Sequence, residues 1–391
     1  LADRASVKAQ VDPSRFRAIY HIWPDFEVSA FIERSIATVK ADAAQKSFAA
    51  RGAGITWAVL DSGIEANHPH FRRYNNIDPN SSWHRDFTLD APGPLTDENG
   101  HGTHVAGIIA GEWVVSPETP EKDRPLAISR YRKQDVDDVE YQEHRLEAIS
   151  GMAPRCRLVS LKVLDDNGKG TVSNLIAAIT HVQEINGYGR RLLIQGVNMS
   201  LGYSFEPEWF ACGQSPLCTE VDRLVKSGVV VVVAAGNTGY GALKSAIGST
   251  AAGLALTIND PGNADLAITV GSTHREMPHM YGVSYFSSKG PTGDGRLKPD
   301  IVAPGERIIS CATGELMKPV GKCDYIESSG TSMAAPHVSG VIAAFLSVRS
   351  EFIGQAERVK EIFVSTATDL RRDRYFQGAG LVDLMRAIQS V

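Results

Sequence analysis

The chain has 391 residues, of which 43% are apolar and 22% are charged, and it carries a net charge of −5 at pH 7. This balance is typical of a globular protein, and without a basic run it argues against binding to nucleic acid or to an anionic membrane surface. The most apolar stretches, residues 229–235 and 338–348, are shorter than the about 20 residues of a membrane-spanning helix.

Residues 1–35 precede the first strand of the main pattern. Within them, residues 16–23 alternate weakly like an edge strand. The sequence begins without methionine and without the apolar core of a signal peptide, so we expect it to start inside a longer precursor.

Between residues 52 and 312, short β-rich runs alternate with helix-like stretches. Because these runs are apolar on both faces, they indicate a buried parallel sheet covered by helices. The expected strands span residues 55–60, 158–163, 192–199, 229–234, 267–270 and 308–311, and the expected helices span 103–110, 171–185 and 218–227.

Residues 112–150 interrupt this alternation. They are rich in charged residues, such as the run from Glu121 to Arg124, and poor in residues that could enter a core. We expect a solvated insertion that is partly helical or mobile.

The five cysteines are an odd number, and their spacings are not those of a zinc site. Cys212 and Cys218 flank a short turn, and Cys311 and Cys323 could face each other across a hairpin. Alternatively, all five, including Cys156, are reduced. The cysteines therefore leave the cellular compartment open.

Asp61 is the first of three residues that could together activate a serine. It follows an apolar strand, at the end where open α/β sheets place their sites, and its carboxylate could accept a hydrogen bond from a histidine. The alternative is an aspartate that caps a turn. Aspartic proteases also use Asp-Ser-Gly, but they need a second such motif, which is absent from this sequence.

His101 opens a helix with Gly102, Thr103 and His104. An imidazole held at a helix start can keep one ring nitrogen free to face a nucleophile, which is the role of a general base. The alternative is a capping or buried histidine. His104 is expected to be a packed helical residue, because no His-Glu-x-x-His zinc motif is present.

Ser332 begins an apolar helix, and Asn237 follows the expected strand 229–234. The backbone N–H of Ser332 and the side-chain amide of Asn237 could both bind a developing oxyanion. Pro336 is expected in the first turn, where helix N–H groups lack partners. The alternatives are a simple N-cap for Ser332 and a turn residue for Asn237.

In chain order, Asp-Ser-Gly, His-Gly-Thr-His-Val-Ala-Gly, Ala-Ala-Gly-Asn and Gly-Thr-Ser-Met-Ala-Ala-Pro resemble the subtilisin-like serine proteases, or subtilases. The resemblance runs from about residue 40 to residue 391. It implies a three-layer α/β fold with a mostly parallel, roughly seven-stranded sheet. It also implies that Asp61 orients His101, the general base and then acid. Ser332 would attack, and Asn237 would complete the oxyanion hole.

The resemblance also extends to substrate-binding segments, whose open, glycine-containing backbone suits the addition of a peptide strand. They comprise Ser200, Leu201 and Gly202; Gly168, Lys169 and Gly170; and Ala234, Ala235 and Gly236.

Two departures from the family pattern limit what the resemblance implies. The stretch after the His101 helix, which begins at Gly111, lacks the Asn-rich calcium loop of many subtilases, so we predict no calcium site there. Residues 165–168 could suggest a metal loop, but a polar hairpin turn is favoured. Residues 238–258 also diverge, so the preference for substrate side chains is not predicted.

The N-terminal region sets the expected domain boundaries. Residues 17–25 resemble the last strand of a subtilase propeptide, and residues 36–44 resemble the start of a mature enzyme. We therefore expect a propeptide remnant or N-terminal extension in residues 1–35. The catalytic domain would span residues 36–391, with the charged insertion at about 112–150.

The function predicted from these residues is that of a serine endopeptidase acting through an acyl-enzyme on Ser332. One alternative is a catalytically silent pseudoprotease that binds peptides or scaffolds a complex. Another is a non-peptide ester hydrolase, which would be expected to show Gly-x-Ser-x-Gly. The charged insertion could act as an exosite, although a tolerated surface loop is favoured.

The expected partners are protein or peptide substrates and the chain's own propeptide. No cofactor is expected for the chemistry and no metal site is assigned, while a structural calcium ion is left open. The compartment also stays open, with a secreted or periplasmic location slightly favoured over the cytoplasm.

Overall fold

The structure is a computed structural model that describes residues 34–88, 93–132, 139–245 and 248–391. The chain divides into residues 1–31 and residues 32–391, and every described residue belongs to the second unit. The expected edge strand at residues 16–23 and nearly all of the expected N-terminal extension therefore lie outside the described residues.

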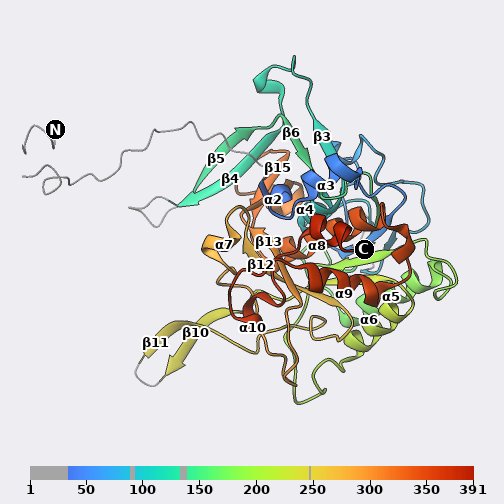
Figure 1. The fold of residues 1–391 in the computed structure, drawn as a ribbon. Helices are drawn as coiled ribbons and strands as arrows, with labels where there is room; N and C mark the ends of the chain where they lie inside the picture. Colours follow the sequence, from blue (N-terminus) through green and yellow to red (C-terminus); the bar gives the residue numbers. More distant parts are fainter. Residues whose placement is uncertain (1–33, 89–92, 133–138, 246–247) are drawn as a thin grey trace, which may run out of the picture. The chain divides into compact units, whose positions relative to one another are not determined.

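A parallel sheet of seven strands forms the centre of the described structure, in the order β13-β12-β9-β8-β1-β7-β2 (Figure 1). Every pair of neighbours in it runs parallel, which confirms the predicted fold class. The strands are β1 (Thr56–Asp61), β2 (Arg85–Asp86), β7 (Arg157–Lys162), β8 (Gly196–Met199), β9 (Val230–Ala234), β12 (Ile268–His274) and β13 (Ile301–Glu306).

Helices cover both faces of this sheet. Strands β1, β8 and β9 are buried at every position, and alternate side chains of a strand point to opposite faces, so neither face meets solvent there. The helices are α2 (Arg34–Thr38), α3 (Ala41–Phe48), α4 (His101–Ile109), α5 (Val172–Ile185), α6 (Pro216–Lys226), α7 (Pro278–Tyr281), α8 (Thr331–Leu346), α9 (Ala356–Thr366), α10 (Arg374–Gln377) and α11 (Leu384–Gln389).

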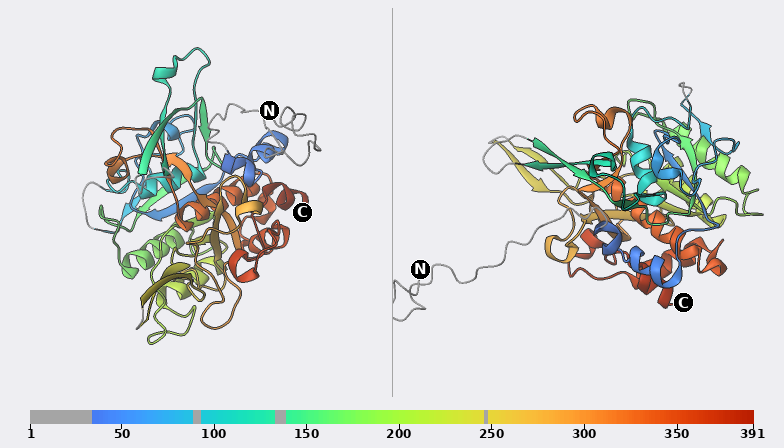
Figure 2. Two further views of the ribbon diagram at one scale, coloured as in Figure 1. Left: turned by 90° about the vertical axis from the view of Figure 1, so that its left-hand side faces the viewer. Right: turned by 90° about the horizontal axis from the view of Figure 1, so that it is seen from above.

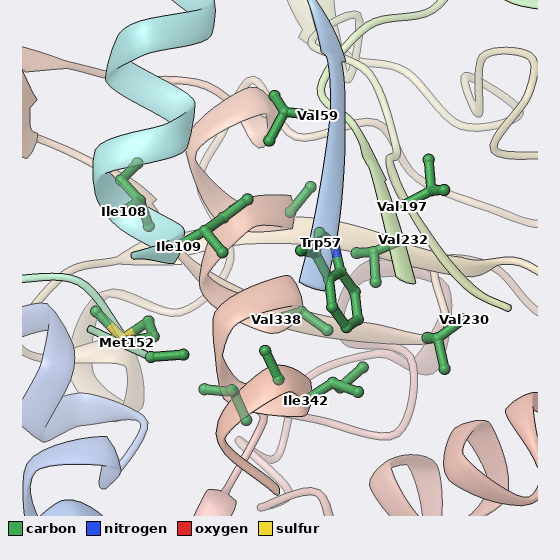
Figure 3. Packing of buried hydrophobic residues seen from close by; sticks show 14 of the residues in the cluster. Trp57, Val59, Ile108, Ile109, Met152, Val197, Val230, Val232, Val338 and Ile342 are labelled. Carbon is green, nitrogen blue, oxygen red and sulfur yellow. The ribbon is translucent and has the colours of Figure 1, made fainter. Parts of the chain in front are cut away.

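Trp57 of β1 is the largest fully buried side chain in the described part of the chain. It packs near Val338 and Ile342 of α8 and near Val230 of β9 (Figure 3). Its partner in the register of β8 is Gly196, where an added Cβ atom would lie 2.2 Å from the indole ring. A glycine is therefore needed at this point of β8 to leave space for the tryptophan.

The expected insertion at residues 112–150 contains two strand pairs, which the prediction of a partly helical or mobile segment did not include. Strand β3 (Glu112–Val114) pairs with β6 (Ala148–Ser150), and β4 (Leu126–Arg132) pairs with β5 (Val139–Arg145). The helical part among its described residues is a 3₁₀ turn at Glu121–Asp123. Figure 2 shows the β4–β5 hairpin extending from the rest of the domain.

A second sheet adds two further strands to this hairpin. Its order is β14-β15-β4-β5, with β14 at Ile308–Cys311 and β15 at Tyr325–Ser328. The run at residues 308–311 is thus a strand, as predicted, but it lies outside the central sheet. Another hairpin, β10 (Tyr240–Ser245) with β11 (Gly248–Gly253), also extends outward (Figure 2).

The five cysteines are buried and free, so neither of the two considered pairings is formed. None of the helices in the described part of the chain combines the length and hydropathy that crossing a bilayer requires.

Candidate active site

Three neighbouring strands of the central sheet bring candidate residues to one edge. Asp61 is the last residue of β1, Ser200 directly follows β8, and Ala234 is the last residue of β9. Because the strands are parallel, their carboxyl ends meet at the same edge, where open α/β sheets bind ligands.

Asp61 and His101 are directly hydrogen-bonded. Nδ1 of His101 lies 2.7 Å from Oδ1 of Asp61, which also accepts a 2.8 Å hydrogen bond from the backbone N–H of Ser62. The Asp61 side chain is 1% exposed, whereas that of His101 is 27% exposed. Since an ionised carboxylate can only accept, Nδ1 carries the proton, and Nε2 of a neutral ring is left with its lone pair.

The backbone before His101 places the ring at the start of a helix. Gly100 is the N-cap of α4 and has a φ of 91°, in the left-handed region that favours glycine. A Cβ atom at this position would also lie 2.3 Å from the carbonyl oxygen of Thr313. The turn that aims His101 toward Asp61 therefore depends on a glycine.

The charge around His101 favours its protonated form. Burial lowers the pKa of His101, but the charge and hydrogen bond of Asp61, with a further contribution from Asp97, outweigh burial and raise the pKa above its ordinary value of 6.5. His104, one turn further along α4, is buried and donates through Nε2 to the carbonyl of Ile326 at 3.0 Å. Burial lowers the pKa of His104 to about 4, as suits a packed helical residue.

Ser332 is the second residue of α8, and its hydroxyl donates to the carbonyl oxygen of Ser200 at 2.9 Å. In return, the hydroxyl of Ser200 donates to the carbonyl of Ser332 at 2.8 Å. Pro336 makes the second bond possible. It lies four residues after Ser332 and has no N–H, so the Ser332 carbonyl lacks its usual partner within the helix. Pro336 thus stands beyond the first turn where it was expected, and it leaves this carbonyl for Ser200.

Asn237 faces the start of α8. Its Oδ1 accepts from the backbone N–H of Thr331 at 2.8 Å and from the Thr331 hydroxyl at 3.0 Å. The backbone N–H can only donate, so the oxygen end of the amide is fixed toward Thr331. The nitrogen, Nδ2, has no acceptor among the described residues, and the residue is exposed.

A cavity of about 790 Å³ joins these groups. His101, Ser332 and Asn237 line it, whereas Asp61 lies behind the His101 ring and does not. Of the nine expected substrate-binding residues, eight line the cavity: Gly168, Lys169, Gly170, Ser200, Leu201, Gly202, Ala234 and Gly236.

Ala235 is the exception, since it does not line the cavity. The residue is fully buried. Its N–H donates to the carbonyl of Val270 at 3.0 Å, and its carbonyl accepts from the N–H of Asn259 at 3.1 Å. Both backbone groups thus make hydrogen bonds within the fold.

Several cavity residues were not predicted from the sequence. Thr238 lies in the divergent segment 238–258, Asn259 directly follows that segment and Tyr203 directly follows residues 200–202, so no motif marked them. Thr331 precedes the candidate nucleophile, and a threonine at a helix start is a signal for a side chain that binds nearby backbone. The remaining unpredicted lining residues are Asn99, Leu164, Thr171, Val172 and Leu175.

The segment at residues 165–168 forms the favoured hairpin turn. The carboxylate of Asp165 accepts from the N–H groups of Asn167, at 3.0 Å, and Lys169, at 2.7 Å. Its backbone N–H donates to the carbonyl of Lys169 at 2.7 Å. Across the described ranges, no three His, Cys, Asp or Glu side chains gather closely enough to hold a metal ion.

Comparison with known proteins shows the family to which the chain belongs. The model of the subtilase family matches residues 52–381. The chain therefore belongs to the subtilase family, a class of serine endopeptidases.

Individual relatives agree with this assignment. The chain is 33% identical to pyrolysin of Pyrococcus furiosus over 74% of its own length and 21% of that protein. It is 30% identical to the serine protease AprX of Bacillus subtilis, over 86% of its length and 66% of the relative. It is also 30% identical to subtilisin of Bacillus pumilus, over 86% of its length and 92% of the relative.

Proposed function

We propose that this protein is a serine endopeptidase that hydrolyses proteins or peptides through an acyl-enzyme on Ser332. The observation that carries the proposal is the 2.7 Å hydrogen bond between Asp61 and His101, beside the cavity that Ser332 and Asn237 also line. Membership of the subtilase family supports the same activity.

The first proposed step is attack by Ser332 on the carbonyl carbon of the scissile bond. The hydroxyl must first leave the Ser200 carbonyl, to which it donates in the free protein, by rotation about its Cα–Cβ bond. It then gives its proton to Nε2 of His101 as Oγ bonds to the carbonyl carbon. Asp61 keeps the ring in the required tautomer and stabilises the imidazolium that forms.

The negative charge that develops on the carbonyl oxygen needs donors. Nδ2 of Asn237 is turned away from Thr331, and the N–H of Ser332 lies in the first turn of α8, where no intrahelical acceptor exists. We assign the oxyanion hole to this pair. The intermediate collapses when the C–N bond breaks and His101 returns its proton to the leaving amine, and water then hydrolyses the acyl-enzyme.

Two open segments that line the cavity are assigned to substrate backbone. They are residues 168–170 and residues 200–202, and an extended peptide in the cavity could pair with each by strand addition. All nucleophilic and acid–base groups in this scheme are side chains, so we propose that the reaction needs no cofactor.

We also propose that residues 1–35 are a propeptide remnant. The test is the intact mass of the purified chain after incubation at neutral pH. Cleavage between about residues 28 and 36 in the wild type, and none in Ser332→Ala, is the expected result. A wild-type chain that stays at full mass while it digests added substrate contradicts processing by its own active site.

The proposed activity is tested with a fluorophosphonate probe and an unfolded protein substrate such as casein. We expect wild type to be labelled once and to digest casein, and Ser332→Ala to lose both properties. Ser328→Ala is the matched control, because Ser328 is a nearby, partly exposed serine at the end of β15. Failure of folded wild type to react with the probe or the substrate would favour a peptide-binding pseudoprotease.

A further inference from the structure

We propose that Asp97 is a positioning residue, which holds the end of β1 against the first turn of α4 and so fixes His101 relative to Asp61. The inference rests on the proposed function, because the geometry that Asp97 fixes is that of the proposed base. Asp97 itself does not line the cavity.

Asp97 is a buried carboxylate that accepts four hydrogen bonds. Oδ1 accepts from the Ser62 hydroxyl at 2.8 Å and from the N–H of Gly100 at 2.8 Å. Oδ2 accepts from the N–H of Thr103 at 2.8 Å and from its hydroxyl at 2.7 Å. The side chain thus binds the free N–H groups at the start of α4 and a residue adjoining Asp61 at the same time.

Ser62 links this carboxylate to the strand end. Its N–H donates to Oδ1 of Asp61 at 2.8 Å, and its hydroxyl, which donates to Asp97, accepts from the N–H of Gly102 at 3.0 Å. Its carbonyl accepts from Nζ of Lys162 at 2.8 Å. Every polar group of Ser62 is therefore engaged, and a shift of Asp97 would be passed to Asp61 through it.

The two segments also touch directly. A Cβ atom at Gly102 would lie 2.1 Å from the carbonyl oxygen of Gly63 and 3.1 Å from Cβ of Asp61. The backbone of α4 therefore rests against residues 61–63 with no side chain between them. Asp97 lies where it can hold the two segments at this separation, which the 2.7 Å contact between Asp61 and His101 requires.

The charge of Asp97 acts on His101 as well. Among the described residues, the titratable groups that interact electrostatically with the ring are Asp61 at the end of β1, Asp97 before α4 and His104 on α4. Asp61 makes the larger contribution that raises the pKa of His101, and Asp97 adds to it. Removing the negative charge of Asp97 therefore lowers the pKa of His101, a change that a purely structural residue would not cause.

Asp383 provides a matched control for Asp97. It is also a buried carboxylate at a helix start, where it accepts from the N–H of Arg386 at 3.0 Å as the N-cap of α11. It also pairs with Lys40. Substitution of either aspartate by asparagine should cost stability, but only one of them lies beside His101.

The experiment compares Asp97→Asn and Asp383→Asn after titration of active sites with the fluorophosphonate probe. For Asp97→Asn we expect kcat per titrated site to fall by about 10- to 100-fold at nearly constant KM, because a small displacement of the base is costly. The acid limb of kcat/KM should move to lower pH. Asp383→Asn should keep the wild-type kcat per titrated site and the wild-type acid limb.

The proposal is overturned if Asp97→Asn keeps the wild-type kcat per titrated site and the wild-type acid limb of kcat/KM. It is also overturned if Asp97→Asn changes these two values no more than Asp383→Asn does. If Asp97→Asn does not fold, Thr103→Val is used instead, because it removes the hydroxyl that donates to Asp97. Thr103→Ser keeps that hydroxyl and should therefore keep the activity that Thr103→Val loses. The NMR titration of His101 separates this inference from the proposed function. His101 should titrate at lower pH in Asp97→Asn than in wild type, even if neither wild type nor the variant cleaves peptides.

Discussion

Thr331 holds the side-chain amide of Asn237 by its oxygen end. The Thr331 N–H and hydroxyl both donate to Oδ1, at 2.8 and 3.0 Å, and the same hydroxyl accepts from the N–H of Gly236 at 3.2 Å. The residue before the proposed nucleophile thus fixes which end of Asn237 faces the cavity. The loop after β9 and the start of α8 are joined at this one side chain.

Replacement of Thr331 by valine should therefore impair catalysis without blocking binding. The variant keeps the side-chain shape and the N–H bond but loses the hydroxyl bonds to Asn237 and Gly236. Each net hydrogen bond contributes about 0.5–1.5 kcal/mol, so we expect kcat to fall by about 2- to 10-fold. A subtilisin loses more, about 10²–10³, when the amide itself is removed.

Steady-state kinetics on a peptide substrate measure this effect, with Thr331→Ser as the control that keeps the hydroxyl. A Thr331→Val enzyme as active as Thr331→Ser would show that the orientation of Asn237 does not depend on the hydroxyl.

The activity of the enzyme should depend on pH through His101. The base must be neutral, and the Asp61 charge raises the pKa of His101, so kcat/KM should fall as pH decreases, with a midpoint above 6.5. In Asp61→Asn the raising influence is lost, so the acid limb should move to lower pH. The rate at neutral pH should drop by about 10⁴, because the ring is no longer held in the required tautomer.

Profiles of kcat/KM against pH for the two proteins test this expectation. An unchanged acid limb in Asp61→Asn would mean that another group controls it.

The packing of Gly196 against Trp57 leads to a prediction about stability. A methyl group added in Gly196→Ala would lie 2.2 Å from the indole ring, and the ring has no exposed space into which to move. We expect a loss of about 1–3 kcal/mol in the free energy of unfolding. Gly253→Ala, in β11, is the control, since its nearest neighbour would lie at 3.6 Å.

Urea unfolding curves give both values. Equal stability of Gly196→Ala and wild type would show that β1 and β8 can separate without cost.

Buried histidines should make the protein sensitive to acid. Burial lowers the pKa of His70 to about 3 and those of His104 and His337 to about 4. Between these values and the ordinary 6.5, the unfolded chain binds more protons than the folded chain, so the free energy of unfolding falls as pH is lowered. Each histidine contributes a slope of up to about 1.4 kcal/mol per pH unit.

This prediction is checked by urea unfolding between pH 4.5 and 6.5. His104→Gln should reduce the slope, whereas His279→Gln, at an exposed position, should leave it unchanged. A slope in His104→Gln that matches wild type would show that His104 does not contribute.

The sequence was most informative where one short segment carried both the structure and the chemistry. The apolar run before Asp61 and the glycines around His101 and Ser332 predicted the central strands, the helix starts and the candidate groups at the sheet edge. These features depend on neighbours a few residues away, which a sequence pattern displays directly.

Features that depend on distant partners were missed. Strand β13 was not among the expected strands. It contains Pro304 and Gly305, and an edge strand tolerates a proline because one side of it needs no pairing. The charged strands β4 and β5 have no apolar pattern that would predict a strand. They form because β4 pairs with β5 and with β15. Asp97 gave no signal of its own, because its role depends on Ser62, 35 residues earlier.

The most direct test of the account is a crystal structure of the protein after reaction with a peptidyl phosphonate. We predict a covalent bond from Oγ of Ser332 to phosphorus and a phosphonyl oxygen within hydrogen-bonding distance of Nδ2 of Asn237. His101 should stay bonded to Asp61 and turn Nε2 toward the adduct. Phosphorus bound to any other residue, or an adduct that neither Asn237 nor His101 contacts, would contradict the assignment of this cavity as the active site.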